Sequence, residues 1–395
     1  MSSTAGHGGA PEVIDWMLRE GRRHTRMREF GDEMCRRIVA AGIPLWRAFC
    51  GVRTLHPLIA ATGYVWYRDE PGASRLIATY ETQTKDFYRN SPPIAVQESG
   101  EPMRRRLEDP DCPLDYPILE EFKGKGCTDY LALPMPFSNG QINSITWSTD
   151  RPGGFSDADV AGLGDIAEML AVIVELQSSR RISRILLDTY VGHRAGSHVL
   201  SGEITRGSGE TIEAVVWLSD LRGFTALTDS LAQDALIDLL DDYMEIVCGA
   251  VTQAGGEVLK FIGDAVLAIF ELDGERDAAV ACAAALAAAG AARVATAAKN
   301  GERRADGKPA FRYGVALHLG TVMYGNIGAP DRLDFTVIGP AVNHAARLEA
   351  LGAELGRPLV ASASFAAHAS DTLERLGAYE LKGVSEPQEV FAPIQ

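Results

Sequence analysis

The stretch that decides the fold of the second half of the chain is EVLKFIGDAVLAIF, residues 257–270. Two apolar segments flank the pair Gly263-Asp264, which is typical of a tight β-hairpin with Asp264 at its tip. An earlier apolar segment, AVVWLSD at residues 214–220, ends in Asp220. We expect the hairpin to lie beside this strand, so that two carboxylates meet at one end of a sheet. Hard divalent cations prefer such oxygen ligands, and the pattern predicts a metal site there.

Helices and strands alternate around this hairpin. Residues 232–253 carry apolar side chains at 3.6-residue spacing, which predicts a helix lying on a sheet, and Gly255-Gly256 ends it. The other expected elements are strands at 212–219, 312–318, 321–327, 334–337, 359–361 and 379–382, and helices at 277–298 and 341–355. This order predicts a ferredoxin-like α/β core.

The first half of the chain has a different pattern. Residues 12–41 have helical periodicity that is broken near Gly21. Strand-like segments follow at 63–68, 75–81, 130–137 and 141–148. Asn139-Gly140 predicts a two-residue hairpin between the last two strands, and Ser156 begins a helix that runs to about residue 177. A sheet between two helical segments predicts a small α/β sensor domain.

A helical linker is expected between the halves. Residues 178–187 form a basic amphipathic pattern, and residues 188–210 are rich in glycine and short polar breaks. A helix continuous with the preceding one suits a two-chain coiled segment that passes a signal onward, and an inert tether is the alternative. The resulting division is an N-terminal extension (1–25), a sensor domain (26–177), a linker (178–210) and a C-terminal domain (211–395).

Composition limits the classes of partner. The 395 residues suit two domains, and 53 acidic against 38 basic side chains give a net charge of −15. This sign argues against nucleic acid or an anionic membrane as the main partner. Six scattered cysteines without a CxxC pair predict reduced thiols and no zinc site. We find no secretion signal, and the most apolar stretches are interrupted by charges, so we expect a cytoplasmic protein.

Five strings in the second half resemble the catalytic domain of class III adenylate cyclases. They are SDLRGFT (219–225), LKFIGDAVLAIF (259–270), RYGVALHLG (312–320), FTVIGPAVNHAARLE (335–349) and ELKGV (380–384). They occur in the family's order and spacing, and the segment that carries them spans about half of the chain. Before them, residues 131–176 resemble a GAF domain. That family binds varied small molecules or none, so the resemblance indicates a fold more than a ligand, and any small-molecule ligand of this domain is unknown.

The cyclase resemblance implies roles for the metal-binding and base-reading residues. Asp220 and Asp264 match the two metal-binding aspartates, with the carbonyl of Leu221 as a further ligand of two Mg²⁺ or Mn²⁺ ions. Lys260 and Thr336 match the residues that read the base in adenylate-type members. This pair suits adenine, whose ring nitrogen accepts from a lysine and whose amine donates to a hydroxyl oxygen.

The resemblance also covers the ribose and the phosphates. Asn343 and Arg347 match the residues that hold the ribose and stabilise the transition state, and they lie four apart on one helix face. Arg312 and Lys382 match the cations that take the phosphates and the departing pyrophosphate. Backbone amides at the start of the helix after Asp220 can also cradle phosphate, those of Gly223, Phe224 and Thr225.

Taken singly, several of these residues have structural explanations. Arg347 with Glu349 is typical of a solvated helix face, and Lys382 of an exposed edge strand. Lys260 lies among apolar residues, where an unpartnered charge is costly, so a functional role is favoured. Their joint occurrence at the family spacing carries the prediction.

The expected function is conversion of ATP to 3′,5′-cyclic AMP and pyrophosphate by two-metal catalysis. Family members place the metal aspartates opposite the base-reading and ribose residues across a dimer interface. One chain carries both sets, so we expect a homodimer with two sites. The alternatives are a guanylate cyclase and a catalytically degenerate nucleotide-binding regulator.

Overall fold

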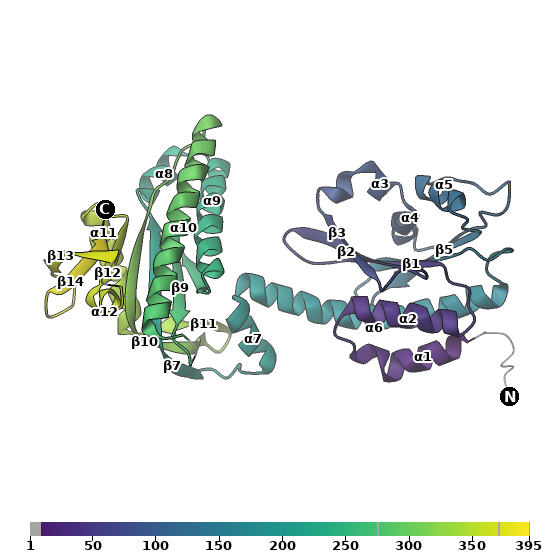
Figure 1. The fold of residues 1–395 in the computed structure, drawn as a ribbon, viewed down its shortest axis with the longest axis horizontal. Coiled ribbons are helices and arrows are strands. Elements are labelled where there is room, and N and C mark those ends of the chain that lie inside the picture. The colour runs from purple at the N-terminus through teal and green to yellow at the C-terminus, as the bar shows by residue number, and fades with distance from the viewer. Residues whose placement is uncertain (1–8, 275, 370–371, 395) are drawn as a thin grey trace. The chain divides into compact units, whose positions relative to one another are not determined.

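The computed structural model describes residues 9–274, 276–369 and 372–394. The chain divides into two compact units, Met1–Ile185 and Leu186–Gln395 (Figure 1). Each unit has its own sheet and its own hydrophobic core. The mixed helix-and-sheet architecture that the sequence predicts is confirmed in both.

The first unit is built on a six-stranded antiparallel sheet in the order β3-β2-β1-β6-β5-β4. Its strands are β1 (Arg47–Arg53), β2 (Ile59–Tyr67), β3 (Ser74–Thr79), β4 (Met103–Arg105), β5 (Asp129–Pro136) and β6 (Ile142–Thr149). Two of them, β1 and β4, were not predicted. The pattern of β1 does not alternate because both of its faces are buried, which removes the period-2 signal.

Helices cover both faces of this sheet (Figure 1). On one face lie α1 (Ala10–Arg19), α2 (Met27–Ala40) and α6 (Asp157–Tyr190), and their apolar side chains share one core with the sheet. The other side carries α3 (Asp86–Arg89), α4 (Pro92–Ser99) and α5 (Pro117–Gly124). Short 3₁₀ turns occur at Gly21–Arg23 and Thr82–Thr84. The break predicted near Gly21 is the first of these turns.

The helix-capping and turn signals read from the sequence can be compared with the structure of this unit. Ser156 Oγ accepts from the Asp159 amide and the Asp159 carboxylate accepts from the Ser156 amide, which is a capping box at the start of α6. The helix runs without a break to Tyr190, so the two helical segments predicted around residue 177 are one. The predicted hairpin turn at Asn139-Gly140 has three loop residues rather than two, because Phe137 pairs with Gln141.

The second unit is built on an eight-stranded sheet in the order β13-β14-β12-β10-β7-β9-β8, with β11 paired to β10. Its strands are β7 (Gly209–Leu221), β8 (Glu257–Ile262), β9 (Ala265–Glu271), β10 (Tyr313–Ala329), β11 (Arg332–Ile338), β12 (Leu359–Ser362), β13 (Leu373–Tyr379) and β14 (Gln388–Pro393). The central pairs are antiparallel, and only β10 with β12 is parallel among the described strands. The strands predicted at 312–318 and 321–327 form one continuous β10.

Different helices pack on the two faces of this sheet. The helices are α7 (His193–Ser201), α8 (Phe224–Ser230), α9 (Gln233–Gln253), α10 (Ala278–Ala305), α11 (Pro340–Glu354) and α12 (Ala363–Ala366). Side chains of α9 and α10 share a core with Val215 and Trp217, whereas α11 packs against the opposite face, where Val216 points. Asp220 has the same strand parity as Val216, so its side chain lies on the α11 face.

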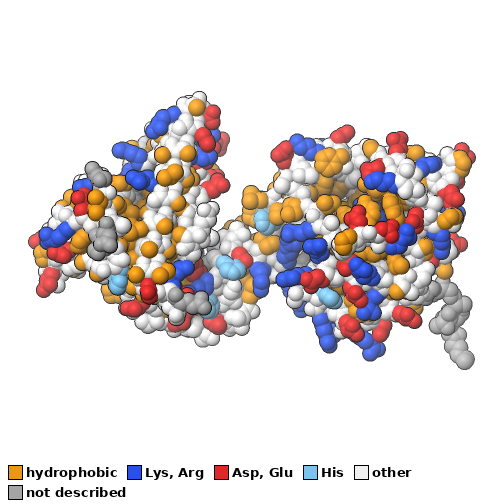
Figure 2. Space-filling model, viewed as in Figure 1, with side chains coloured by type: hydrophobic (Ala, Val, Ile, Leu, Met, Phe, Trp, Pro, Cys, Tyr) orange, Lys and Arg blue, Asp and Glu red, His pale blue; other side chains and the backbone are white. Residues whose placement is uncertain are grey.

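By length and composition alone, α10 is the one described helix apolar enough to cross a membrane. Its buried face, which includes Ala281, Cys282 and Ala285, packs in the core of the second unit. Val280 and Val294 stay exposed, and Figure 2 shows hydrophobic side chains along this helix. The described cysteines are all free thiols, as predicted.

One predicted strand is wrong. Residues 379–382 do not form a strand: β13 ends at Tyr379, and Lys382 lies in a turn before β14. The Val384 amide donates to the Leu381 carbonyl, and Gly383 has a φ of +74°, a left-handed conformation that glycine adopts without strain. Lys382 is therefore an exposed turn residue rather than an edge-strand charge.

Candidate active site

The two predicted metal-binding aspartates meet at one end of the central sheet. Ile262 pairs with Ala265, so Gly263-Asp264 is a two-residue hairpin loop, and Gly263 has the positive φ (+66°) of a type II′ turn. Asp220 is the next-to-last residue of β7. The pKa of Asp220 is raised to about 7. The main cause is burial, followed by a hydrogen bond with the Asp264 carboxyl and by the charges of Asp264 and Glu349.

This pair fits a divalent cation. The Oδ1 atom of Asp220 is buried without a hydrogen-bond partner, and its carboxyl faces that of Asp264. A cation between them would satisfy the orphaned oxygen and remove the repulsion between the carboxylates. Among the described residues no group of three or more His, Cys, Asp or Glu side chains is arranged to hold a metal. Further ligands would therefore come from the backbone, as predicted for Leu221, or from substrate and water.

A buried ion pair lies beside the aspartate pair, and the sequence did not predict it. Arg222 Nη1 donates to Glu349 Oε1 over 2.5 Å, and the two side chains are 21% and 8% exposed. Arg222 crosses β10 at Gly314, where a Cβ would lie 1.7 Å from its Nη2 atom. Burial raises the pKa of Glu349, while the Arg222 charge lowers it. The solvated helix face considered for Glu349 is therefore wrong.

The two base-reading candidates come from β8 and β11, which do not pair with each other in the sheet. Lys260 on β8 donates to Asp334 Oδ2 on β11 over 2.6 Å, so the partner that a lysine in an apolar strand requires is Asp334. Thr336 on β11 is buried, and its Oγ1 has no hydrogen-bond partner. The β11 strand thus offers one paired carboxylate and one unused hydroxyl two residues apart.

The ribose and transition-state candidates lie on α11. Asn343 is exposed and Arg347 is half-buried. The Arg347 guanidinium lies 3.3 Å from the point where a Cβ on Gly383 would stand, which brings it to the turn that carries Lys382. Within the described part of the chain, neither Asn343 nor Arg347 makes a side-chain hydrogen bond or ion pair with Asp220 or Asp264.

Some phosphate-binding candidates lie near the aspartate pair, and one lies near Arg347 on α11. The Arg312 carbonyl accepts from the Arg222 amide over 2.8 Å, so Arg312 lies beside the turn that follows Asp220, with its side chain exposed. Gly223 precedes α8, whose first turn begins at Phe224 and Thr225 and leaves amides without helical acceptors. Lys382 lies in the turn that the Arg347 guanidinium approaches at Gly383. The sequence missed Arg222, Glu349 and Asp334, although each lies within or beside a motif quoted above.

Residues 209–392 match the family model described as the adenylate and guanylate cyclase catalytic domain. The match covers β7 to β14, and with them the aspartate pair and α11. The C-terminal unit is therefore a class III adenylate/guanylate cyclase catalytic domain. The predicted family resemblance is confirmed for this unit, while no comparison identifies the first unit as a GAF domain.

Named proteins similar to this chain include adenylate cyclases. "Adenylate cyclase 1" of Rhizobium meliloti (strain 1021) is 27% identical over 64% of this chain and 38% of its own length. "Adenylate cyclase" of Anabaena cylindrica is 34% identical over 38% of this chain and 29% of its own length. The crystal structure of the adenylyl cyclase CyaB from P. aeruginosa is 28% identical, covers 48% of this chain and 96% of that chain, and has a TM-score of 0.41. The alignments span less than half the length of both curated relatives.

Proposed function

We propose that this protein is an adenylate cyclase that converts ATP to 3′,5′-cyclic AMP and pyrophosphate. The observation that carries the proposal is the Asp220–Asp264 pair, in which a buried carboxylate oxygen lacks any protein partner. Membership of the C-terminal unit in the adenylate and guanylate cyclase family supports cyclisation of a nucleotide. The names of the similar proteins support ATP as the substrate.

Asp220, Asp264 and the Leu221 carbonyl are the proposed ligands of two Mg²⁺ or Mn²⁺ ions. Such ions supply Lewis-acid activation of the ribose 3′-hydroxyl and neutralise the triphosphate charge. The pairing of Arg222 with Glu349 fixes the turn that follows Asp220, so the carboxylate is held in place before substrate arrives. The role of these residues is to hold two negatively charged carboxylates in fixed positions for the metal ions.

The remaining residues orient the nucleotide for an in-line attack of the 3′-oxygen on the α-phosphorus. Asn343 holds the ribose, and Arg347 places positive charge near the phosphorus as the transition state forms. Arg312 and Lys382 receive the departing pyrophosphate. The first amides of α8, at Gly223, Phe224 and Thr225, bind phosphate oxygens through their free N–H groups.

Adenine is the proposed base because of the two polar groups near β11. Lys260, held by Asp334, donates to a ring nitrogen, and Thr336 Oγ1 accepts from the exocyclic amine. Guanine presents an oxygen where adenine presents the amine, so it would reverse this part of the pattern. A guanylate cyclase is the alternative substrate assignment, and a degenerate regulator is the alternative without turnover.

A second copy of the chain is the proposed partner. Among the described residues of one chain, Asn343 and Arg347 form no side-chain hydrogen bond or ion pair with the aspartates, so each site would combine the aspartates of one subunit with α11 of the other. Phe261 and Ile262, between Lys260 and the hairpin tip, are 52% and 53% exposed. Apolar side chains exposed beside polar site residues suit burial against a partner copy.

We also propose that the first unit regulates the cyclase as a GAF-like sensor in the cytoplasm. The proposed organisation is an extension (1–25), a sensor (26–177), a linker (178–210) and the catalytic domain (211–395). The continuous helix α6 supports a linker that transmits a signal, since an uninterrupted helix is stiffer than a loop.

The direct test measures cyclic nucleotide made from ATP and from GTP by the purified chain with Mg²⁺ or Mn²⁺. We expect cyclic AMP from ATP at a rate well above cyclic GMP from GTP. A preference for GTP would establish the guanylate alternative. If the chain binds ATP but makes no cyclic product from either nucleotide, the alternative of a catalytically degenerate regulator would be supported.

A further inference from the structure

Arg47 on β1 is a buried cation without an acidic partner. Only 7% of the residue is exposed. Its Nε donates to Tyr67 Oη over 3.1 Å, and among the described residues no carboxylate lies within ion-pair distance of its guanidinium. Burying an unpaired charge is costly, so arginines in such positions normally have an anion beside them. The terminal nitrogens of Arg47 are not among the fully buried polar atoms that lack a partner, so they reach the surface, where an anion can meet them.

The register of the sheet surrounds Arg47 with hydroxyl groups. Tyr67 and Ser148 lie directly opposite Arg47 on β2 and β6, and Tyr130 lies opposite Ser148 on β5. Residues opposite one another on antiparallel strands share a face, so these four side chains form one row. Ser148 is fully buried, and its Oγ makes no hydrogen bond of ordinary geometry, although the Cys127 thiol lies beside it. We call Tyr67, Arg47, Ser148 and Tyr130 the polar row.

Aromatic rings cover this row without completing it. The Arg47 Cζ atom lies 4.8 Å from the ring centroid of Phe122 on α5, 5.5 Å from that of Tyr67 and 5.7 Å from that of Phe49. Cation–π contacts offset part of the desolvation of the charge. A ring face, however, does not match the fork of N–H donors in the plane of a guanidinium. The in-plane donors remain available to a planar or tetrahedral oxyanion.

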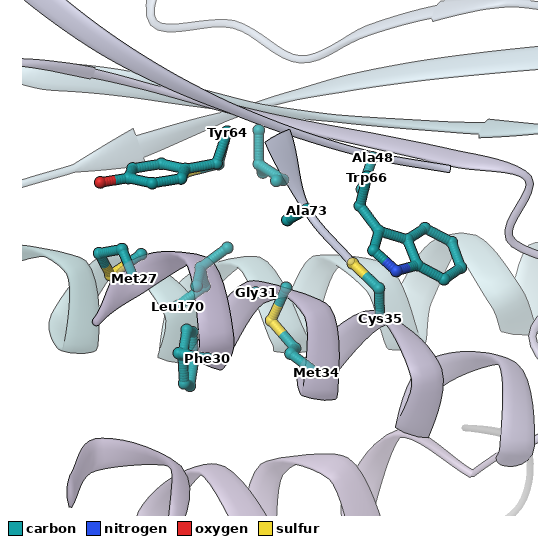
Figure 3. A pocket seen from close by; sticks show the side chains of 12 residues that line it. Met27, Phe30, Gly31, Met34, Cys35, Ala48, Tyr64, Trp66, Ala73 and Leu170 are labelled. Atoms are coloured by element: carbon teal, nitrogen blue, oxygen red, sulfur yellow. The ribbon is translucent and has the colours of Figure 1, made fainter. Parts of the chain in front are cut away.

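The opposite side of the sheet has two small cavities among the described residues, and one of them is lined by Arg181 on α6, which is part-exposed and donates to Tyr64 Oη. Figure 3 shows the other cavity, lined mainly by apolar and sulfur-containing side chains such as Met27, Met34 and Cys35. Its volume of about 20 Å³ suits a single water molecule rather than an organic ligand. Arg47 differs from Arg181 in being buried in the sheet, so the α5 side is the better candidate for binding an anion.

We propose that the polar row binds the carboxylate or phosphate group of a small molecule, with Arg47 as the anion-binding residue beneath α5. A guanidinium pairs with such oxyanions through two parallel N–H···O bonds. The Ser148 hydroxyl supplies a further donor. This assignment names the chemistry that the first unit recognises, and it stands whether or not the second unit makes cyclic AMP.

The test uses the full-length chain and its intrinsic fluorescence. Four of the five tryptophans lie in the first unit, and Trp46 is adjacent to Arg47 and stacked edge-on against Phe122 at 5.9 Å. Thermal unfolding is followed by tryptophan emission in sodium phosphate and in sodium acetate, each compared with sodium chloride at equal ionic strength. The variants are Arg47→Met and, as the matched control, Arg75→Met, which removes an exposed arginine from β3 of the same sheet.

We expect phosphate or acetate to raise the unfolding midpoint of wild type and of Arg75→Met by the same amount. The rise should be about 2–4 °C at a concentration near four times the dissociation constant. Arg47→Met should show no such rise, and Ser148→Ala, a small change that keeps the fold, should need several-fold more anion for the same shift. In chloride alone Arg47→Met should unfold no earlier than the control, because it loses an unpaired buried charge.

Three results would overturn the proposal. One is a wild type that responds to neither anion, and another is an equal response in Arg47→Met, which would locate binding elsewhere, including the catalytic unit. The third is a large drop in the midpoint of Arg47→Met in chloride together with an unchanged response in Ser148→Ala. That result would give Arg47 a purely structural cation–π role. Cyclase activity enters none of these readouts, so they are independent of the proposed function.

Discussion

The guanidinium of Arg222 donates to the carboxylate of Glu349 over 2.5 Å, and this ion pair joins the turn after β7 to helix α11. The turn follows Asp220, and α11 carries Asn343 and Arg347. Under the proposed shared-site arrangement, these two elements of one chain serve different active sites. The Arg222–Glu349 pair therefore connects the geometry of one site to that of the other.

Replacing Glu349 with Gln should weaken both stability and turnover. Arg222 would keep its buried charge without a counter-ion, and the free energy of unfolding should fall by roughly 3 kcal/mol. Urea unfolding measures this change. Glu354→Gln, at an exposed position on the same helix, is the control and should change little. The double variant Arg222→Met/Glu349→Leu should recover stability but not kcat; if Glu349→Gln matches the control, the pair has no supporting role.

Asp220→Asn and Asp264→Asn should abolish cyclic AMP production while the fold is kept. The raised pKa of Asp220 means that stability falls as pH rises from about 4 to 7, since the unfolded carboxyl ionises first. In chelator at pH 8, Asp220→Asn should thus unfold later than wild type. Added Mn²⁺ should stabilise wild type and the control variant but neither of the two site variants. The control is Asp241→Asn on the exposed side of α9, and wild-type rates in either site variant would exclude the two-metal site.

The base-reading pair predicts a loss of preference for ATP. Lys260→Glu faces Asp334 with a like charge, and Thr336→Cys removes the hydroxyl oxygen. Each lost hydrogen bond costs about 1–3 kcal/mol, so kcat/KM for ATP should fall roughly 5- to 150-fold per position before any gain with GTP. Thr321→Cys, exposed on β10, controls for the substitution itself. An undiminished ATP preference in the double variant would contradict the assignment.

Complementation tests the shared site. A chain with both Asp220→Asn and Asp264→Asn and a chain with Arg347→Ala should each be nearly inactive. Half of randomly formed dimers would be mixed, with one intact site of two, so co-expression should restore roughly a quarter of wild-type activity. Differently tagged chains allow the mixed dimer to be purified and assayed. A purified mixed dimer no more active than its parents would require a site within one chain.

The stacked histidines of β10 and α11 predict an acid-sensitive second unit. His318 and His344 lie with ring centroids 4.3 Å apart, and burial followed by the charge of His344 lowers the pKa of His318 to about 4. The unfolded chain takes up a proton first as pH falls below 6.5, so stability is lost between about pH 6.5 and 4, by up to about 3 kcal/mol. Urea unfolding at pH 7.5 and 4.5 should show a smaller loss for His318→Gln than for wild type. The exposed His368→Gln should lose as much as wild type; an equal loss in His318→Gln would assign the acid sensitivity to other groups.

Features that depend on neighbouring residues could be predicted from the sequence. Gly263-Asp264 forms the expected two-residue turn because a glycine with positive φ and flanking apolar strands are sufficient for a hairpin. Ser156 caps its helix for the same local reason. The strand β1 was missed because it is covered on both faces, and Lys382 was placed in a strand because turn and edge-strand sequences are both polar.

The sequence by itself determined which chemical groups the second unit carries, since five motifs in the family's order specify its two aspartates, the proposed base-reading pair and the polar residues of α11. Only the tertiary structure decided how those groups are supported. Arg222 and Glu349 are 127 positions apart, and Lys260 and Asp334 are 74 apart. No local propensity reports such pairings, because they depend on which strand lies beside which and on which face each side chain occupies. The unpaired charge of Arg47 is of the same kind: an arginine in a sequence does not show whether an acid stands beside it.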